Sequence, residues 1–87
     1  MEVYRLKHVP SGLYYKPGNP NLSKRGKVYF GGSNRLTYHK GPIICMIRIG
    51  SPMYKQLEVV EGIKWGKPGS RDICAYIPRE QFIKEQI

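Results

Sequence analysis

The sequence has little cysteine and no spacing of ligating residues that would hold a metal. Its two cysteines, Cys45 and Cys74, lie within apolar runs, and neither belongs to a C-x-x-C or Cys/His pattern. Small domains stapled by disulfides usually carry more cysteines, so we expect both thiols to be reduced. A single disulfide between them stays open as the alternative. No metal or other cofactor is predicted.

Long apolar runs are also missing. The longest, Ile43 to Ile47, is far too short to span a bilayer, and the N-terminal residues MEVYRLKHV contain no apolar segment of the kind that a secretion signal needs. We therefore expect a cytoplasmic protein without membrane contact. At 87 residues the chain is expected to form one domain, residues 1–87, around a single core.

Acidic residues are scarce in the first half of the chain. The net charge is +9, and residues 1–40 carry eight Lys or Arg against one acid, Glu2, whereas residues 41–87 carry seven against five. A concentrated positive field raises the rate of association with polyanions. The distribution favours a partner such as RNA, and a basic surface that serves only solubility is the alternative.

Alternation of apolar and polar residues predicts a mostly antiparallel β-sheet. Residues 2–9 place Tyr4, Leu6 and His8 on one face, and the turn at residues 9–12 leads into a second strand at residues 13–16, which makes an N-terminal hairpin. In the predicted register Lys7 lies opposite Tyr15. Proline, glycine and asparagine predict a loop over residues 16–23. Further strands are predicted over residues 27–30, 35–40, 43–49, 55–60 and 72–77.

Two features of the second half complete the predicted fold, which is α+β. Residues 43–49 are nearly all apolar, which predicts a buried central strand. Pro78 is tolerated at a first helical position, and Phe82, Ile83 and Ile87 can form an apolar stripe, so we predict a short C-terminal helix. Such a short helix must pack on the sheet or on a second copy of the chain, which leaves a homodimer open.

The stretch from Asn21 to Lys40 combines cations, aromatic rings and glycines without an acid. Ser23 to Lys27 places three cations in four positions around Gly26, and such a cluster suits contact with a phosphate backbone. The motif is not a P-loop, because Val28 stands where Ser or Thr is required. Residues 28–30 are expected to be half buried. The alternative is that these three cations are only solvated and contact no phosphate.

Aromatic side chains in the same basic half can stack on bases. Tyr15 and Tyr38 are the main candidates, with Tyr29 a weaker one, because the alternation places them beside cations. Together with the neighbouring cations and His39, they form the predicted nucleic-acid-binding set: Arg5, Lys7, Tyr15, Lys16, Lys24, Arg25, Lys27, Arg35, Tyr38, His39 and Lys40.

Two histidines leave a catalytic alternative open. His8, His39 and a lysine such as Lys40 have the chemistry for metal-independent RNA cleavage, since histidine titrates near neutral pH. No spacing in the sequence brings them together, so the prediction is a protein that is not an enzyme. A further alternative is an inhibitor that binds an acidic surface of another protein.

Three segments, YRLKH at residues 4–8, SGLYY at residues 11–15 and NLSKRGKVY at residues 21–29, resemble small basic proteins encoded by T-even-like bacteriophages. These proteins include a toxin-inhibition factor that counters the RNA-cleaving toxin ToxN. The resemblance implies a phage protein in the host cytoplasm that binds RNA and neutralises a host ribonuclease toxin or another defence protein. It also implies that the cations of Ser23 to Lys27 carry the RNA contact. It does not extend to residues 43–87 and supplies no catalytic residue.

Overall fold

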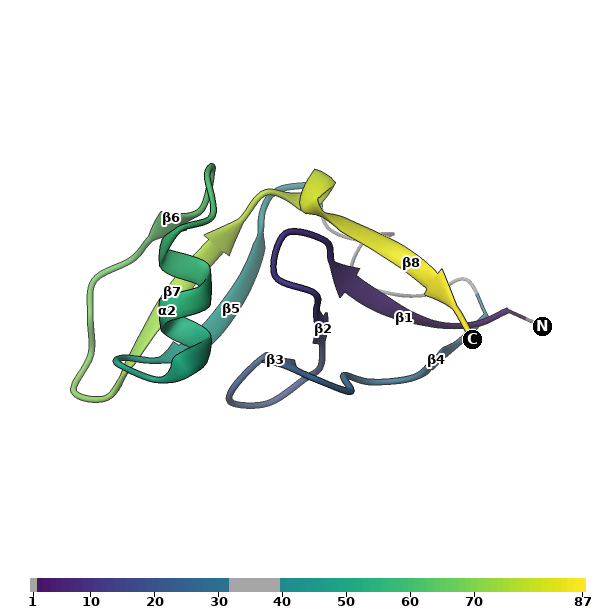
Figure 1. Ribbon diagram of the computed structural model, residues 1–87, viewed down its shortest axis with the longest axis horizontal. Coiled ribbons are helices and arrows are strands. Elements are labelled where there is room, and N and C mark those ends of the chain that lie inside the picture. The colour runs from purple at the N-terminus through teal and green to yellow at the C-terminus, as the bar shows by residue number, and fades with distance from the viewer. Residues whose placement is uncertain (1, 32–39) are drawn as a thin grey trace.

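The computed structural model describes residues 2–31 and 40–87 and has extents of 41 × 24 × 21 Å (Figure 1). The expected strand at residues 35–40 falls almost wholly outside this part of the chain. The elements, in order, are β1 (Val3–His8), β2 (Leu13–Tyr15), β3 (Leu22–Ser23), β4 (Tyr29–Phe30), β5 (Ile43–Arg48), α2 (Pro52–Glu58), β6 (Lys64–Trp65), β7 (Asp72–Ile77), the 3-10 turn η1 (Arg79–Gln81) and β8 (Phe82–Gln86). Within the described residues, antiparallel pairing and a short helix confirm the α+β class.

The first sheet has five strands and is built around β1. β8 pairs along one edge of β1, while β2 and β4 share the other edge, and β3 extends the sheet beyond β2. Tyr4, Leu6 and His8 of β1 are buried, and the residues between them are half buried. The predicted first strand and N-terminal hairpin are therefore confirmed.

The register of the hairpin differs from the prediction by one residue. Lys7 lies opposite Tyr14, and His8 lies opposite Leu13. Residues 9–12 connect the two strands, and this turn is closed by the Gly12 amide donating to the His8 carbonyl at 2.8 Å. Because side chains alternate along a strand, a shift of one residue exchanges the faces of Tyr14 and Tyr15.

The second sheet has three strands in the order β5-β7-β6. Ile43, Cys45 and Ile47 of β5 lie opposite Ile77, Ala75 and Ile73 of β7, and these six side chains form its buried face. The expected strands at residues 43–49 and 72–77 are thus present, but the central strand is β7 rather than β5.

Both cysteines are free, as expected. Cys74 lies opposite Met46, and Cys45 lies opposite Ala75, so the two cysteines are on opposite faces of their sheet. A disulfide between them would require the strands to change register.

The prediction of a strand over residues 55–60 is wrong, because most of that stretch belongs to α2. Ser51 caps this helix by accepting from the Tyr54 amide at 3.1 Å, and Pro52 occupies its first turn. Met53 and Tyr54 pack against the core, and Leu57 is fully buried. This i, i+1, i+4 spacing is helical, and α2 lies across one face of the β5-β7 pair in Figure 1.

The predicted C-terminal helix is also wrong. A single 3-10 turn follows Pro78, and the chain then forms β8, which pairs with β1 from Tyr4–Gln86 to His8–Phe82. The edge of β1 offers a full row of backbone hydrogen bonds, which outweighs the weak helical signal of the local sequence. Phe82 is buried against His8, so residues 82–86 form no helix that could pack on a second copy of the chain.

Asn21 joins the two sheets. Its side-chain oxygen accepts from the Met46 amide at 2.7 Å, and its own amide donates to the Met46 carbonyl at 3.2 Å. Its side-chain nitrogen donates to the Lys16 carbonyl at 3.1 Å. The predicted loop over residues 16–23 is therefore fixed against the free edge of β5, and it ends in the short strand β3.

One buried cluster contains side chains from both sheets and from α2. Its members include Tyr4, Leu6, Tyr15, Leu22, Ile47, Leu57 and Phe82. Within the described residues, no helix is both long enough and apolar enough to cross a membrane.

Candidate nucleic-acid interface

The five-stranded sheet presents one face to the core and one to solvent. The alternation in β1 and the registers of its neighbours place seven side chains on the solvent side, which we call the outer face: Val3, Arg5, Lys7, Tyr14, Phe30, Ile83 and Glu85. Arg5 lies over the Tyr14 ring, with its guanidinium carbon 5.4 Å from the ring centroid. The predicted pairing of cation and ring is thus present, with Tyr14 in the place expected for Tyr15.

Glu85 is the carboxylate of the outer face, and it is already engaged. It accepts a hydrogen bond from the Tyr14 hydroxyl and lies 3.3 Å from the Lys7 ammonium. The hydrogen bond to Glu85 raises the pKa of Tyr14, and the same bond is the main cause that lowers the pKa of Glu85. Lys7 therefore has a carboxylate partner in this fold, whereas the Nε of Arg5 has no hydrogen-bond partner among the described residues.

Residues 23–27, which we call the basic turn, rest directly on Tyr14. The Ser23 hydroxyl accepts from the Gly26 amide at 2.7 Å, and the Lys27 amide donates to the Tyr15 carbonyl at 3.0 Å. Gly26 has a positive φ of 66°, and a Cβ at this position would lie 2.3 Å from the Cβ of Tyr14. Only glycine allows this approach, which places the basic turn beside the outer face.

The three cations of the basic turn are exposed. Within the part of the chain that the structure describes, no carboxylate pairs with Lys24, Arg25 or Lys27. The Lys27 ammonium lies 5.2 Å from the centroid of the Tyr29 ring, a cation–π distance. These charges are therefore available to an anionic ligand.

The aromatic candidates are only partly in their expected places. Tyr15 is 5% exposed and belongs to the core, so its prediction as a stacking residue is wrong. Tyr29 is half buried and stacks on Tyr4, with ring centroids 5.8 Å apart. Tyr38 lies outside the described residues.

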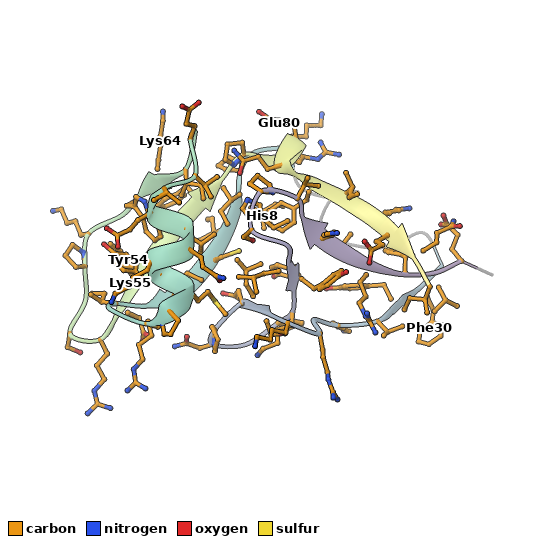
Figure 2. The ribbon with its side chains drawn as sticks, in the orientation of Figure 1. His8, Phe30, Tyr54, Lys55, Lys64 and Glu80 are labelled. Atoms are coloured by element: carbon orange, nitrogen blue, oxygen red, sulfur yellow. The ribbon has the colours of Figure 1, made fainter. Side chains whose placement is uncertain are left out.

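Phe30 is the exposed ring that sequence reasoning missed. It is 64% exposed and stands at the end of the first sheet away from α2, as Figure 2 shows. The signal was present in the sequence, because Tyr29 points inward from β4 and the next residue must then point outward. Residues 28–30 were expected to be half buried as a group, which concealed this alternation.

The remaining predicted cations are dispersed. Lys16 is half buried, and its backbone amide donates to the Asn21 carbonyl. Lys40 is exposed and lines a hollow with Arg79, Glu80 and Phe82, near η1, which lies across the molecule from β3 in Figures 1 and 2. Lys40 therefore does not extend the basic turn. Arg35 and His39 lie outside the described residues.

His8 is buried between the two sheets, with none of its surface exposed (Figure 2). Its Nε2 lies 2.7 Å from the Gln81 side-chain oxygen, and its Nδ1 lies 2.6 Å from the Ser11 hydroxyl. The Gln81 side-chain nitrogen donates to the Glu61 carbonyl at 2.8 Å, which orients the amide so that its oxygen accepts from His8. Both ring nitrogens are therefore engaged by side chains of the fold.

The arrangement can hold an anion and a flat ring side by side. The basic turn provides cations that no carboxylate of the described residues neutralises, and Tyr14 and Phe30 provide aromatic rings on the adjoining sheet surface. Among the described residues, no group of three or more His, Cys, Asp or Glu is placed to bind a metal ion. Comparisons with protein families, with curated proteins and with solved structures find no match.

Proposed function

We propose that this protein binds RNA without cleaving it, through the basic turn and the outer face. The observation that carries the proposal is the contact between Gly26 and Tyr14, because it holds the backbone of the basic turn against the residue whose ring Arg5 covers. Phosphates require cations, and unpaired bases require flat rings on which to stack.

The pattern of exposure fits a single-stranded or looped RNA better than a regular duplex. Single-stranded RNA is recognised by stacking of splayed bases on aromatic side chains, together with backbone contacts. Tyr14 is half buried and hydrogen-bonded to Glu85, so its ring is held rigidly, while Phe30 is open to solvent. A rigid ring and an open ring on one sheet face suit two separate unpaired bases of one strand, because Tyr14 lies opposite Lys7 and Phe30 lies opposite Val3.

The biological part of the proposal follows from the resemblance of residues 4–29 to small basic phage proteins. In this role the protein acts in the cytoplasm of an infected host and neutralises an RNA-targeting defence factor, such as an endoribonuclease toxin. RNA held on the basic turn would bring the protein to a partner that binds the same RNA. The cations of Ser23 to Lys27 belong to the resembling segment and to the candidate interface alike.

Charge reversal of the basic turn tests the binding step. The triple variant Lys24→Glu, Arg25→Glu, Lys27→Glu should abolish binding to a short single-stranded RNA, measured by fluorescence anisotropy. Its thermal transition should move little, because exposed charges contribute little to stability and the Lys27–Tyr29 contact is worth about 0.5–1 kcal/mol.

The matched control reverses three other exposed lysines, Lys55, Lys64 and Lys67, and so makes the same change in net charge. Lys55 and Lys64 lie on the α2 and β6 side of the molecule in Figure 2. The control should retain most of the affinity. Equal losses in the two variants would reduce the interaction to net charge alone and overturn the proposed interface.

A second candidate function is inhibition by direct contact with an acidic protein surface. Val3 lies between Phe30 on one neighbouring strand and Ile87 on the other, and the exposed side chains of Phe30 and Ile87 give this end of the sheet an apolar surface that also suits a protein partner. A pull-down from a host that expresses the toxin separates the two candidates. If RNA carries the interaction, nuclease treatment releases the partner; a complex that survives nuclease unchanged favours the protein contact.

A further inference from the structure

A second feature adjoins the basic turn on the side that faces α2. A cavity of about 480 Å³ lies between the loop that precedes β3 and the start of α2. Its walls are mainly apolar and come from four side chains, Leu13, Pro20, Pro52 and Met53. Leu13 belongs to the buried core, so the floor of the cavity is fixed by the fold. The volume is within the range of sites that hold small ligands.

Two cations flank this apolar cavity. Lys24 reaches it from the basic turn, and Arg48 reaches it from the end of β5. Both side chains are exposed, and no carboxylate pairs with either within residues 2–31 and 40–87. An apolar slot between two unpaired cations is complementary to a ligand that has a flat, weakly polar part joined to an anion.

One polar side chain at the cavity is free to recognise such a ligand. The Ser51 hydroxyl is occupied, since it accepts from the Tyr54 amide and donates to the Arg48 carbonyl at 2.8 Å. Gln56 is exposed and its amide has no partner among the described residues. A primary amide offers donors and an acceptor together, which is the pattern needed to pair with the edge of a nucleobase.

A smaller hollow of about 280 Å³ continues from the cavity, and the two share Pro20 and Arg48. Arg71 also lines the hollow, and so does Asp72, whose carboxylate accepts from the Asn19 side chain at 3.2 Å. Two guanidinium groups therefore face one engaged carboxylate. The hollow, which Lys24 does not line, therefore adds a further cation next to the cavity.

We infer that this cavity is a nucleotide subsite that takes one unpaired base of a bound RNA. The base lies between Pro20 and Met53 with its edge toward Gln56, while Lys24 and Arg48 hold the phosphates on either side. The inference rests on the proposed RNA-binding function and adds to it a specific pocket on the α2 side of the basic turn. Flipped bases are held in this way elsewhere, between apolar side chains and polar groups that read the base edge.

Nuclear magnetic resonance on the wild-type protein tests the subsite without RNA. The probes are adenosine and uridine 5′-monophosphate, with ribose 5-phosphate as the ligand that lacks a base. We expect both nucleotides to shift the Met53 methyl and Gln56 side-chain amide signals, and ribose 5-phosphate to leave them unchanged. Equal shifts with ribose 5-phosphate, or shifts confined to the basic turn, would overturn the subsite. A larger Met53 shift with decanoate than with either nucleotide would assign the cavity to an anionic amphiphile instead.

A variant extends the test to RNA. Met53→Trp fills the cavity, and because one stacked base contributes about 1–3 kcal/mol we expect roughly a tenfold loss of affinity for a single-stranded RNA. The same variant should bind an abasic ribose-phosphate chain as tightly as wild type does. If wild type binds RNA and Met53→Trp binds it equally well, the subsite is wrong while the interface on the basic turn stands. If wild type does not bind RNA at all, the proposed function itself fails.

Discussion

Gly26 is the residue on which the position of the basic turn depends. Gly26→Ala should lower the free energy of unfolding by about 3 kcal/mol, because it combines a left-handed backbone cost of about 1–2 kcal/mol with overpacking of about 1–3 kcal/mol against Tyr14. It should also weaken RNA binding without changing any charge. Denaturant unfolding and fluorescence anisotropy measure the two effects.

Gly12→Ala is the matched control for Gly26→Ala. Gly12 has a similar φ of 75°, but a Cβ there would meet nothing within 4 Å. The Gly12→Ala variant should lose only about 1 kcal/mol of the free energy of unfolding, from the cost of the left-handed backbone conformation. Its affinity for RNA should be unchanged. If the two variants were equally destabilised, the close contact between Gly26 and Tyr14 would not be important to the fold.

His8 makes the stability of the fold depend on pH. Burial lowers the pKa of His8 below its ordinary value of 6.5, and the hydrogen bond to Gln81 opposes this shift in part. The unfolded chain therefore binds a proton at a pH where the folded protein does not. The contribution of neutral His8 to the free energy of unfolding should therefore be complete above about pH 6.5. This contribution should be lost as the pH is lowered from there toward the pKa of His8 in the folded protein.

Urea unfolding between about pH 7.5 and about pH 5 measures this dependence, since carboxylates titrate mostly below that window. His8→Gln is expected to be less stable and to lose most of the slope. The His8 ring shifts of folded wild type provide a second measurement that does not need the variant. A His8 imidazole that titrates at or above 6.5 in the folded protein would contradict this account.

One residue of register explains why the sequence predicted a cation and a ring on one face of the hairpin but named the wrong ring. The alternation in β1, which places Arg5 and Lys7 on the same face, is confirmed. The pairing of residues across the turn at residues 9–12 was wrong by one, since several turn geometries suit Pro-Ser-Gly. Because faces alternate, that single residue moved Tyr15 into the core and Tyr14 to the surface.

Two elements show where local sequence signals were insufficient. Residues 52–58 have the apolar spacing of a helix and a Ser-Pro start. However, two β-branched residues follow the helix, Val59 and Val60, and these favoured the prediction of a strand. Residues 82–86 follow a plausible helical start but form a strand that pairs with β1. In this pairing Phe82 lies opposite His8, which is 74 residues earlier in the sequence. Pairing over that distance leaves no local trace in the sequence.

The helix α2 should depend on a single buried side chain. Leu57→Ala removes its only fully buried residue and should lower the free energy of unfolding by about 2–5 kcal/mol. Val59→Ala at the C-terminal end of the helix is the control, because Val59 is 82% exposed and should change stability by less than about 0.5 kcal/mol. Similar effects of the two substitutions in urea unfolding would show that α2 does not pack as described.

At the scale of the whole molecule, the charge asymmetry of the sequence maps onto one region of the fold only in part. The first hairpin and residues 23–27 come together because the loop fixed by Asn21 returns the chain past Tyr14. Lys40 does not join them, and Arg48, from the less basic half of the sequence, lines the same cavity as Lys24 instead. Composition predicted that a basic surface exists, but only the tertiary contacts decide which cations share it.

The salt dependence of RNA binding measures whether the basic turn contacts phosphates. Each phosphate contact on a single strand contributes about 0.7 to the slope of log affinity against log salt concentration. Replacing Lys24, Arg25 and Lys27 by Ala should therefore reduce the slope by about 2, while the same replacement of Lys55, Lys64 and Lys67 should leave it unchanged. A slope that is the same for wild type and the basic-turn variant would contradict the account.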